Sequence, residues 1–156
     1  MAELKTLSFA AASGRVGMVL LIGDRLVDWR MSRKASTSPG AAAVYATRLI
    51  EDLRPDVVVT EAPGVANCKG EHSKAIVAAI ASVARERPLL DISTPRVQRH
   101  ADKYAEAAAL AERWPDIAAW KPKKRRFFDT EPRSTIMFEA LALAQAVLVS
   151  SDSRGA

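Results

Sequence analysis

Residues 55–63 have the sequence Pro-Asp-Val-Val-Val-Thr-Glu-Ala-Pro, and the fold is organised around them. Three consecutive β-branched residues between prolines predict a short strand that is buried in the centre of a sheet. This strand brings Glu61 to its carboxyl end, just before a turn expected at Pro63 and Gly64. Because ligands of open α/β sheets bind at the carboxyl ends of strands, Glu61 is a candidate site residue. The alternative is a solvated charge at a strand end.

Ahead of this strand, the sequence predicts an antiparallel meander followed by a helix. A tight hairpin turn is expected at Gly23 and Asp24. Residues 40–54 have apolar side chains at helical spacing beside an alanine-rich face, which predicts an amphipathic helix that crosses over to the central strand. The three strands of the meander are expected at residues 4–12, 16–22 and 26–31.

Behind the central strand, helices alternate with one more strand. Helical spacing over residues 73–87 ends at Pro88, and a short apolar strand is expected at residues 89–92. Thr94 and Pro95 predict the start of a further helix, because a threonine N-cap suits a proline at the first helical position. Two more helices are expected at residues 104–114 and 134–149, with a flexible polar tail at residues 150–156.

This order of elements predicts an α/β protein with one domain over residues 1–149. An antiparallel three-stranded meander followed by two right-handed crossovers yields a mixed five-stranded sheet. The last two strands are then parallel, and helices cover both faces of the sheet. The chain of 156 residues is long enough to bury one substantial core.

The composition is that of a globular protein, with 49% hydrophobic and 26% charged residues. We find no apolar run of bilayer-spanning length and no signal-peptide pattern, so we expect a cytoplasmic protein without a membrane partner. Cys68 is the one cysteine, which excludes a disulfide framework and a thiolate metal cage. Cys68 and His72 alone do not suffice for a zinc site.

The net charge of +5 and the isoelectric point near 9.7 favour polyanionic partners. Trp120 and the pair Phe127-Phe128 flank a basic run, and such a surface suits nucleic acid, since cations bind phosphates and aromatic rings stack on unpaired bases. The alternatives are a solvated loop and, for the phenylalanines, anchors in the core. The candidate nucleic-acid-binding residues are Lys121, Lys123, Lys124, Arg125 and Arg126 in the run, with Arg96, Arg99 and Lys103 in a second basic group.

These elements and motifs resemble those of the RuvC-type Holliday-junction resolvases, which have a ribonuclease H-like fold. Residues 10–17, Ala-Ala-Ala-Ser-Gly-Arg-Val-Gly, resemble the end of the family's first strand and the turn after it. Residues 57–61 resemble the family's strand that ends in glutamate. Residues 138–144, Phe-Glu-Ala-Leu-Ala-Leu-Ala, resemble its last helix, which carries an acid in an apolar run. The likeness covers most of the chain through short, degenerate motifs.

The resemblance implies hydrolysis of phosphodiester bonds in branched or structured DNA by a homodimer. In this family, clustered carboxylates hold two divalent ions, and oxygen ligands of this kind suit Mg²⁺ or Mn²⁺. It implies that Glu61 and Glu139 are catalytic and metal-binding residues. Asp129 and Glu131, just ahead of the last helix, are candidate substitute ligands.

The chain departs from the family pattern at Ala10, where the resemblance would place an aspartate that bridges both metals. Ile136 stands where the family often has another acid. Because alanine cannot be a ligand, two hypotheses follow: a metal-dependent endonuclease with a depleted site, or an inactive nucleic-acid-binding or assembly module that needs no cofactor. A third is a small protein-interaction domain with a solvated basic loop. The sequence alone does not distinguish a natural alanine from an inactivating substitution.

Glu139 is expected to be buried, because its helix is apolar almost all round. A buried charge requires a partner, since its desolvation is costly. The partner is a metal according to the resemblance, and an arginine or lysine according to the alternative. If Glu61 and Glu139 met without any cation, the pKa of one of them should be raised.

Overall fold

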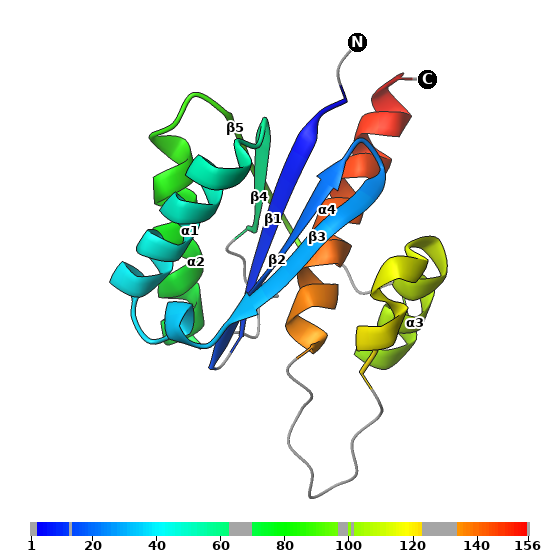
Figure 1. The fold of residues 1–156 in the computed structure, drawn as a ribbon, viewed down its shortest axis with the longest axis horizontal. Coiled ribbons are helices and arrows are strands. Elements are labelled where there is room, and N and C mark those ends of the chain that lie inside the picture. Colours follow the sequence, from blue (N-terminus) through cyan, green and yellow to red (C-terminus); the bar gives the residue numbers. More distant parts are fainter. Residues whose placement is uncertain are drawn as a thin grey trace, which may run out of the picture.

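The structure is a computed structural model that describes residues 3–12, 14–62, 70–96, 100, 102–122 and 134–155, with the backbone alone for residues 149–155. Within these ranges, one mixed sheet is covered by helices on both faces (Figure 1). None of the helices that these residues form is both long and apolar enough to cross a bilayer.

The sheet has five strands in the order β3-β2-β1-β4-β5. The predicted antiparallel meander and the two parallel strands are confirmed, because β1 pairs antiparallel with β2 and parallel with β4, and β4 pairs parallel with β5. The bounds are Lys5–Ala12 for β1, Arg15–Ile22 for β2, Arg25–Ser32 for β3, Val57–Glu61 for β4 and Leu90–Thr94 for β5.

Strand β4 is the buried inner strand that the Val-Val-Val run predicts. All five of its residues are buried between β1 and β5. Because side chains alternate along a strand, Val58 packs into one core, whereas Val57 and Val59 pack into the core on the other face. A strand that is apolar toward both faces therefore fits only inside the sheet.

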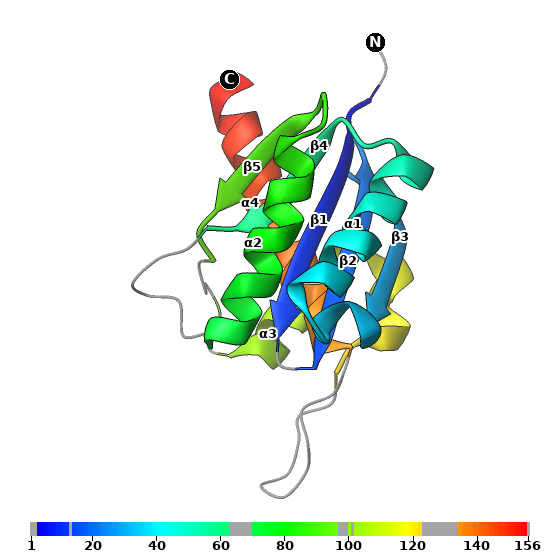
Figure 2. The same cartoon turned by 90° about the vertical axis from the view of Figure 1, so that its left-hand side faces the viewer.

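Helices form one layer on each side of the sheet. Figure 2 shows α1 and α2 in front of the strands and α3 and α4 behind them. The cores on the two faces are separate clusters of buried side chains. The bounds are Pro39–Leu53 for α1, Glu71–Arg85 for α2, Lys103–Arg113 for α3 and Thr135–Gly155 for α4, with short 3-10 helices η1 at Lys34–Ser36 and η2 at Pro115–Trp120.

The predicted helix start at Thr94 and Pro95 is wrong. Thr94 is the last residue of β5 and pairs with Glu61, and Pro95 follows outside any helix. Helix α3 is instead capped by Asp102, whose Oδ1 accepts hydrogen bonds from the backbone N–H groups of Tyr104 and Ala105 at 3.0 and 2.9 Å. The Thr-Pro pattern is a local signal, and the pairing of β5 with β4 overrides it.

Helix α4 continues through Gly155, beyond the end expected at residue 149. The division into one domain and a flexible tail stays a prediction.

A close approach between β2 and α4 fixes the position of α4. A Cβ atom on Gly17 would lie 2.8 Å from Cγ2 and 2.9 Å from the backbone carbon of Ile136. One turn further along α4, the Ser8 hydroxyl on β1 donates a hydrogen bond to the carbonyl oxygen of Ala140 at 2.7 Å. These contacts hold the first turns of α4, and Glu139 with them, against the sheet.

Candidate functional site

The candidate site lies where the carboxyl ends of β1 and β4 meet helix α4. The parallel pairing of β1 with β4 ends with Ser8 opposite Val59, and Ala10 and Glu61 each follow that pair by two residues toward the carboxyl ends of their strands. Ala10 and Val59 belong to the core on the α4 face, and Glu61 shares the face of Val59 because side chains alternate along a strand. Glu61 is buried, with 6% of its surface exposed, so the alternative of a solvated strand end is wrong.

Strand β5 brings Arg96 to the same place. The pairing of β4 with β5 aligns Glu61 with Thr94, and the backbone N–H of Ala62 donates a hydrogen bond to the carbonyl oxygen of Thr94 at 2.8 Å. This anchors the chain just ahead of Arg96. The position of Arg96 therefore follows from strand pairing.

The guanidinium of Arg96 lies between glutamates of two different helices. Its Nη2 donates a hydrogen bond to Oε1 of Glu106 in α3 at 2.7 Å, and its Nε lies 3.6 Å from Oε1 of Glu139 in α4. These side chains are shielded from water, with exposed fractions of 18% for Arg96, 7% for Glu106 and 20% for Glu139. We refer to Arg96, Glu61, Glu106 and Glu139 as the ion-pair cluster.

The electrostatics of the ion-pair cluster favour a cation strongly. Burial on its own would lower the pKa of Arg96, because desolvation disfavours the charged guanidinium. The carboxylates of Glu139, Glu106 and Glu61 outweigh this effect, and the pKa of Arg96 is raised above its ordinary value. Arg96 therefore keeps its positive charge in this site.

The structure brings together two of the predicted site residues. Glu61 and Glu139, which are far apart in the sequence, both act on Arg96. The expectation that Glu139 has a cationic partner is confirmed. Of the two partners considered, a metal ion or a basic side chain, the contact in the structure is with an arginine. The catalytic and metal-binding roles of both glutamates stay predictions.

The other predicted site residues are placed only in part. Lys121 is exposed just after η2, and Lys103 is the first residue of α3. Arg96 lies inside the ion-pair cluster, and its direct contact with nucleic acid stays a prediction. The residues outside the described part of the chain are Cys68, Arg99, Lys123, Lys124, Arg125, Arg126, Phe127, Phe128, Asp129 and Glu131.

The described residues do not fit a centre for two metal ions. The Ala10 side chain carries no ligand atom, and Ile136 is buried among apolar side chains. Within the described ranges, no group of three or more His, Cys, Asp and Glu side chains is arranged to hold a metal ion. The carboxylates of Glu106 in α3 and Glu139 in α4 contact the guanidinium of Arg96.

Glu106 is the site residue that the sequence analysis missed. It lies on the buried face of α3 with Ala107, Leu110 and Ala111. Its spacing of four residues from Leu110 is the one signal that could have found it, because residues at i and i+4 share one face of a helix. An acid on an apolar helical face indicates a buried charge with a partner.

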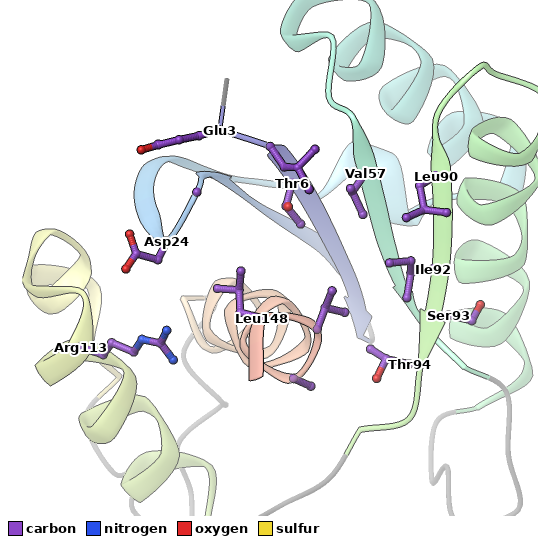
Figure 3. A pocket seen from close by; sticks show the side chains of 14 residues that line it. Glu3, Thr6, Asp24, Val57, Leu90, Ile92, Ser93, Thr94, Arg113 and Leu148 are labelled. Carbon is purple, nitrogen blue, oxygen red and sulfur yellow. The ribbon is translucent and has the colours of Figure 1, made fainter. Parts of the chain in front are cut away.

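A separate cavity of about 730 Å³ lies between β5, the start of β1 and the second half of α4. Figure 3 shows Glu3, Asp24 and Arg113 on one side of it and Ile92 of β5 on the other side, with Leu148 of α4 between the two sides. No residue of the ion-pair cluster lines this cavity. It is therefore a second concave surface, distinct from the candidate site.

A mixed sheet in this strand order, with helices on both faces, defines a ribonuclease H-like α/β protein. Within that class, the chain has the fold of RuvC and other Holliday-junction resolvases. The predicted fold class and the predicted resemblance are thus confirmed.

Two of the solved structures match this chain over nearly their full lengths. Thermus thermophilus RuvC in complex with a Holliday junction substrate superposes with a TM-score of 0.67 at 14% identity, covering 95% of this chain and 95% of that chain. The fowlpox virus Holliday junction resolvase superposes with a TM-score of 0.62 at 15% identity, covering 94% and 99%. No protein-family model matches the sequence, and no curated protein matches it. At these identities the similarity establishes the fold.

Proposed function

We propose that this protein binds branched DNA on a RuvC-type fold. The observation that carries the proposal is the similarity, over 95% of both chains, to a RuvC structure that contains a Holliday junction. A fowlpox virus resolvase of similar fold also forms a complex with junction DNA. The net charge of +5 suits a polyanionic ligand.

An aromatic pair next to the basic run supports the same proposal. Trp120 is 46% exposed, and its ring meets that of Trp29 edge-on with the centroids 5.5 Å apart. Lys121 follows directly and is exposed. Aromatic rings beside cations provide a surface for bases and phosphates.

We expect the protein to retain a four-way junction in a gel shift more strongly than a splayed duplex or a linear duplex. Because binding to DNA releases counterions, the affinity should fall steeply between about 50 and 200 mM salt. Replacing Lys123 and Lys124 together by glutamine should weaken binding to all three DNAs. It should also reduce the salt slope by about one for each phosphate that the protein no longer neutralises.

The matched control replaces Arg25 and Arg85 by glutamine, which removes the same charge elsewhere. Both side chains are well exposed, at 67% and 70%. Arg25 pairs with Ile22, which pairs with Lys5 at the start of β1, so it lies at the opposite end of the sheet from Glu61. This control should keep most of the affinity. If the unchanged protein retained none of the three DNAs even at low salt, the proposal would be wrong.

The second candidate function is cleavage of branched DNA with Mg²⁺ or Mn²⁺. The observation that favours it is that Glu61 at the end of β4 and Glu139 in α4 both act on Arg96, although the described residues do not fit two metal ions. We expect the unchanged protein to bind a labelled four-way junction with Mn²⁺ present and to leave it uncut. Cleavage that disappears in Glu61→Gln would establish this second candidate.

The change Ala10→Asp tests whether the missing carboxylate is what limits cleavage. It adds an acid to β1, which pairs with β4 ahead of Glu61, on the strand where the family has its aspartate. New cleavage by this variant would show that the rest of the site is competent. The homodimer implied by the resemblance is a proposal as well.

A further inference from the structure

We propose that Arg96 is the permanent cation of this site and takes the electrostatic role that divalent metal ions have in RuvC-type resolvases. The inference concerns the chemistry of the ion-pair cluster and goes beyond DNA binding, so the two are tested separately. It rests on three features: the buried carboxylates, the geometry of the guanidinium, and the identity of residue 10.

Buried carboxylates need a positive charge among them. Glu61 and Glu106 are 6% and 5% exposed, and the Glu139 side chain is 20% exposed. Like charges held close together in a protein interior destabilise one another unless a cation or protons neutralise them. The RuvC family meets this requirement with metal ions, whereas here a covalently attached guanidinium lies among the carboxylates.

Two different nitrogen atoms of the Arg96 guanidinium contact glutamates of two different helices. Nη2 is directed to Glu106 in α3 and Nε to Glu139 in α4, and the planar group presents both in a fixed geometry. Since Arg96 follows β5, these contacts connect the sheet edge to both helices of that face. A metal ion would have to compete with Arg96 for the same carboxylate oxygens.

The alanine at position 10 also lowers the attraction of the site for divalent ions. It is 2% exposed and packs in the core on the α4 face, two residues after Ser8, just as Glu61 follows by two residues the Val59 that pairs with Ser8. An aspartate there would add a fourth acid to three carboxylates that already act on one guanidinium. The alanine lowers the number of acids, and Arg96 adds a fixed positive charge, so both features reduce the attraction of the site for divalent ions.

The test is a titration with Mn²⁺ alone, followed by calorimetry and thermal unfolding. We expect no saturable binding by the unchanged protein and no increase in its Tm. Arg96→Gln leaves the carboxylates without their guanidinium, so it should bind Mn²⁺ and gain roughly 5–10 °C in Tm at a hundredfold excess over Kd. Adding Glu139→Gln to Arg96→Gln should remove most of this response.

The matched control is Arg87→Gln. Arg87 pairs with Glu51 at 3.4 Å on the surface, and its removal should produce no response to Mn²⁺. If Arg96→Gln does not fold without metal, Arg96→Lys keeps the charge, and this variant should resemble the unchanged protein in showing no saturable binding.

Two results would overturn the inference. The first is saturable Mn²⁺ binding by the unchanged protein that Glu61→Gln abolishes. The second is an Arg96→Gln variant that folds but neither binds Mn²⁺ nor gains in Tm when Mn²⁺ is added. A gel shift of the same variants on a four-way junction keeps the two proposals apart. If the unchanged protein did not bind the junction, the proposed function would be wrong, but the Mn²⁺ titration would still test the role of Arg96.

Discussion

Arg96→Gln is expected to lower the free energy of unfolding by about 3–5 kcal/mol in metal-free buffer, because it removes the cation from a set of buried carboxylates. The pair with Glu106 is 2.7 Å long, and both side chains are less than one fifth exposed. Because these side chains are largely shielded from water, the desolvation of the carboxylates is then no longer offset by a hydrogen-bonded cation. Urea unfolding measures the change as a lower midpoint at unchanged slope.

The surface pair between Arg87 and Glu51 provides the comparison. Its side chains are 32% and 59% exposed, so Arg87→Gln should change the free energy of unfolding by less than about 1 kcal/mol. In a double-mutant cycle, adding Glu106→Gln to Arg96→Gln should recover part of the stability, because one of the unpaired acids is then neutral. Arg96→Gln with an effect as small as that of Arg87→Gln would show that the carboxylates do not depend on the guanidinium.

Gly17→Ala is expected to lower the free energy of unfolding by about 1–3 kcal/mol, since a well-packed interface does not accept an added methyl group. The new Cβ would lie 2.9 Å from both the backbone carbon and the backbone oxygen of Ile136, which cannot rotate away as a flexible side chain can. Either β2 or the first turn of α4 must move. Because Glu139 follows Ile136 by one turn, the contact with Arg96 should loosen as well.

Gly40→Ala is the matched control, since it adds the same methyl group to a different glycine. Gly40 lies in the first turn of α1, and a Cβ there would meet only the Ser38 hydroxyl oxygen, at 3.8 Å. The change should leave stability unaltered or raise it by about 0.5 kcal/mol, because alanine favours helix. Thermal unfolding should therefore shift in opposite directions for the two variants. Equal shifts would mean that the approach of α4 to β2 is less tight than the structure shows.

Some elements could be predicted because their own residue types show how they are buried or how they turn. The Val-Val-Val run can be buried on both faces only inside a sheet, and the structure places it there. The Gly23-Asp24 hairpin has the positive φ of 62° at Gly23 that such a turn requires. Thr94 and Pro95 misled because a helix cap and a strand end share the same local pattern, and hydrogen bonds from β4 decide between them.

Apart from the helix start expected at Thr94, the amino-acid sequence by itself determined the order of strands and helices, because the spacing of apolar side chains along each element already records which face leaves water. It also indicated that Glu139 needs a partner, although the Glu139 side chain, expected to be buried, is 20% exposed. Only the tertiary structure decided that this partner is Arg96 and that Glu106 joins it. These ion pairs join Arg96, which follows β5, to Glu106 in α3 and Glu139 in α4. Which of several cations meets a buried acid depends on how whole elements pack, and no local pattern carries that information.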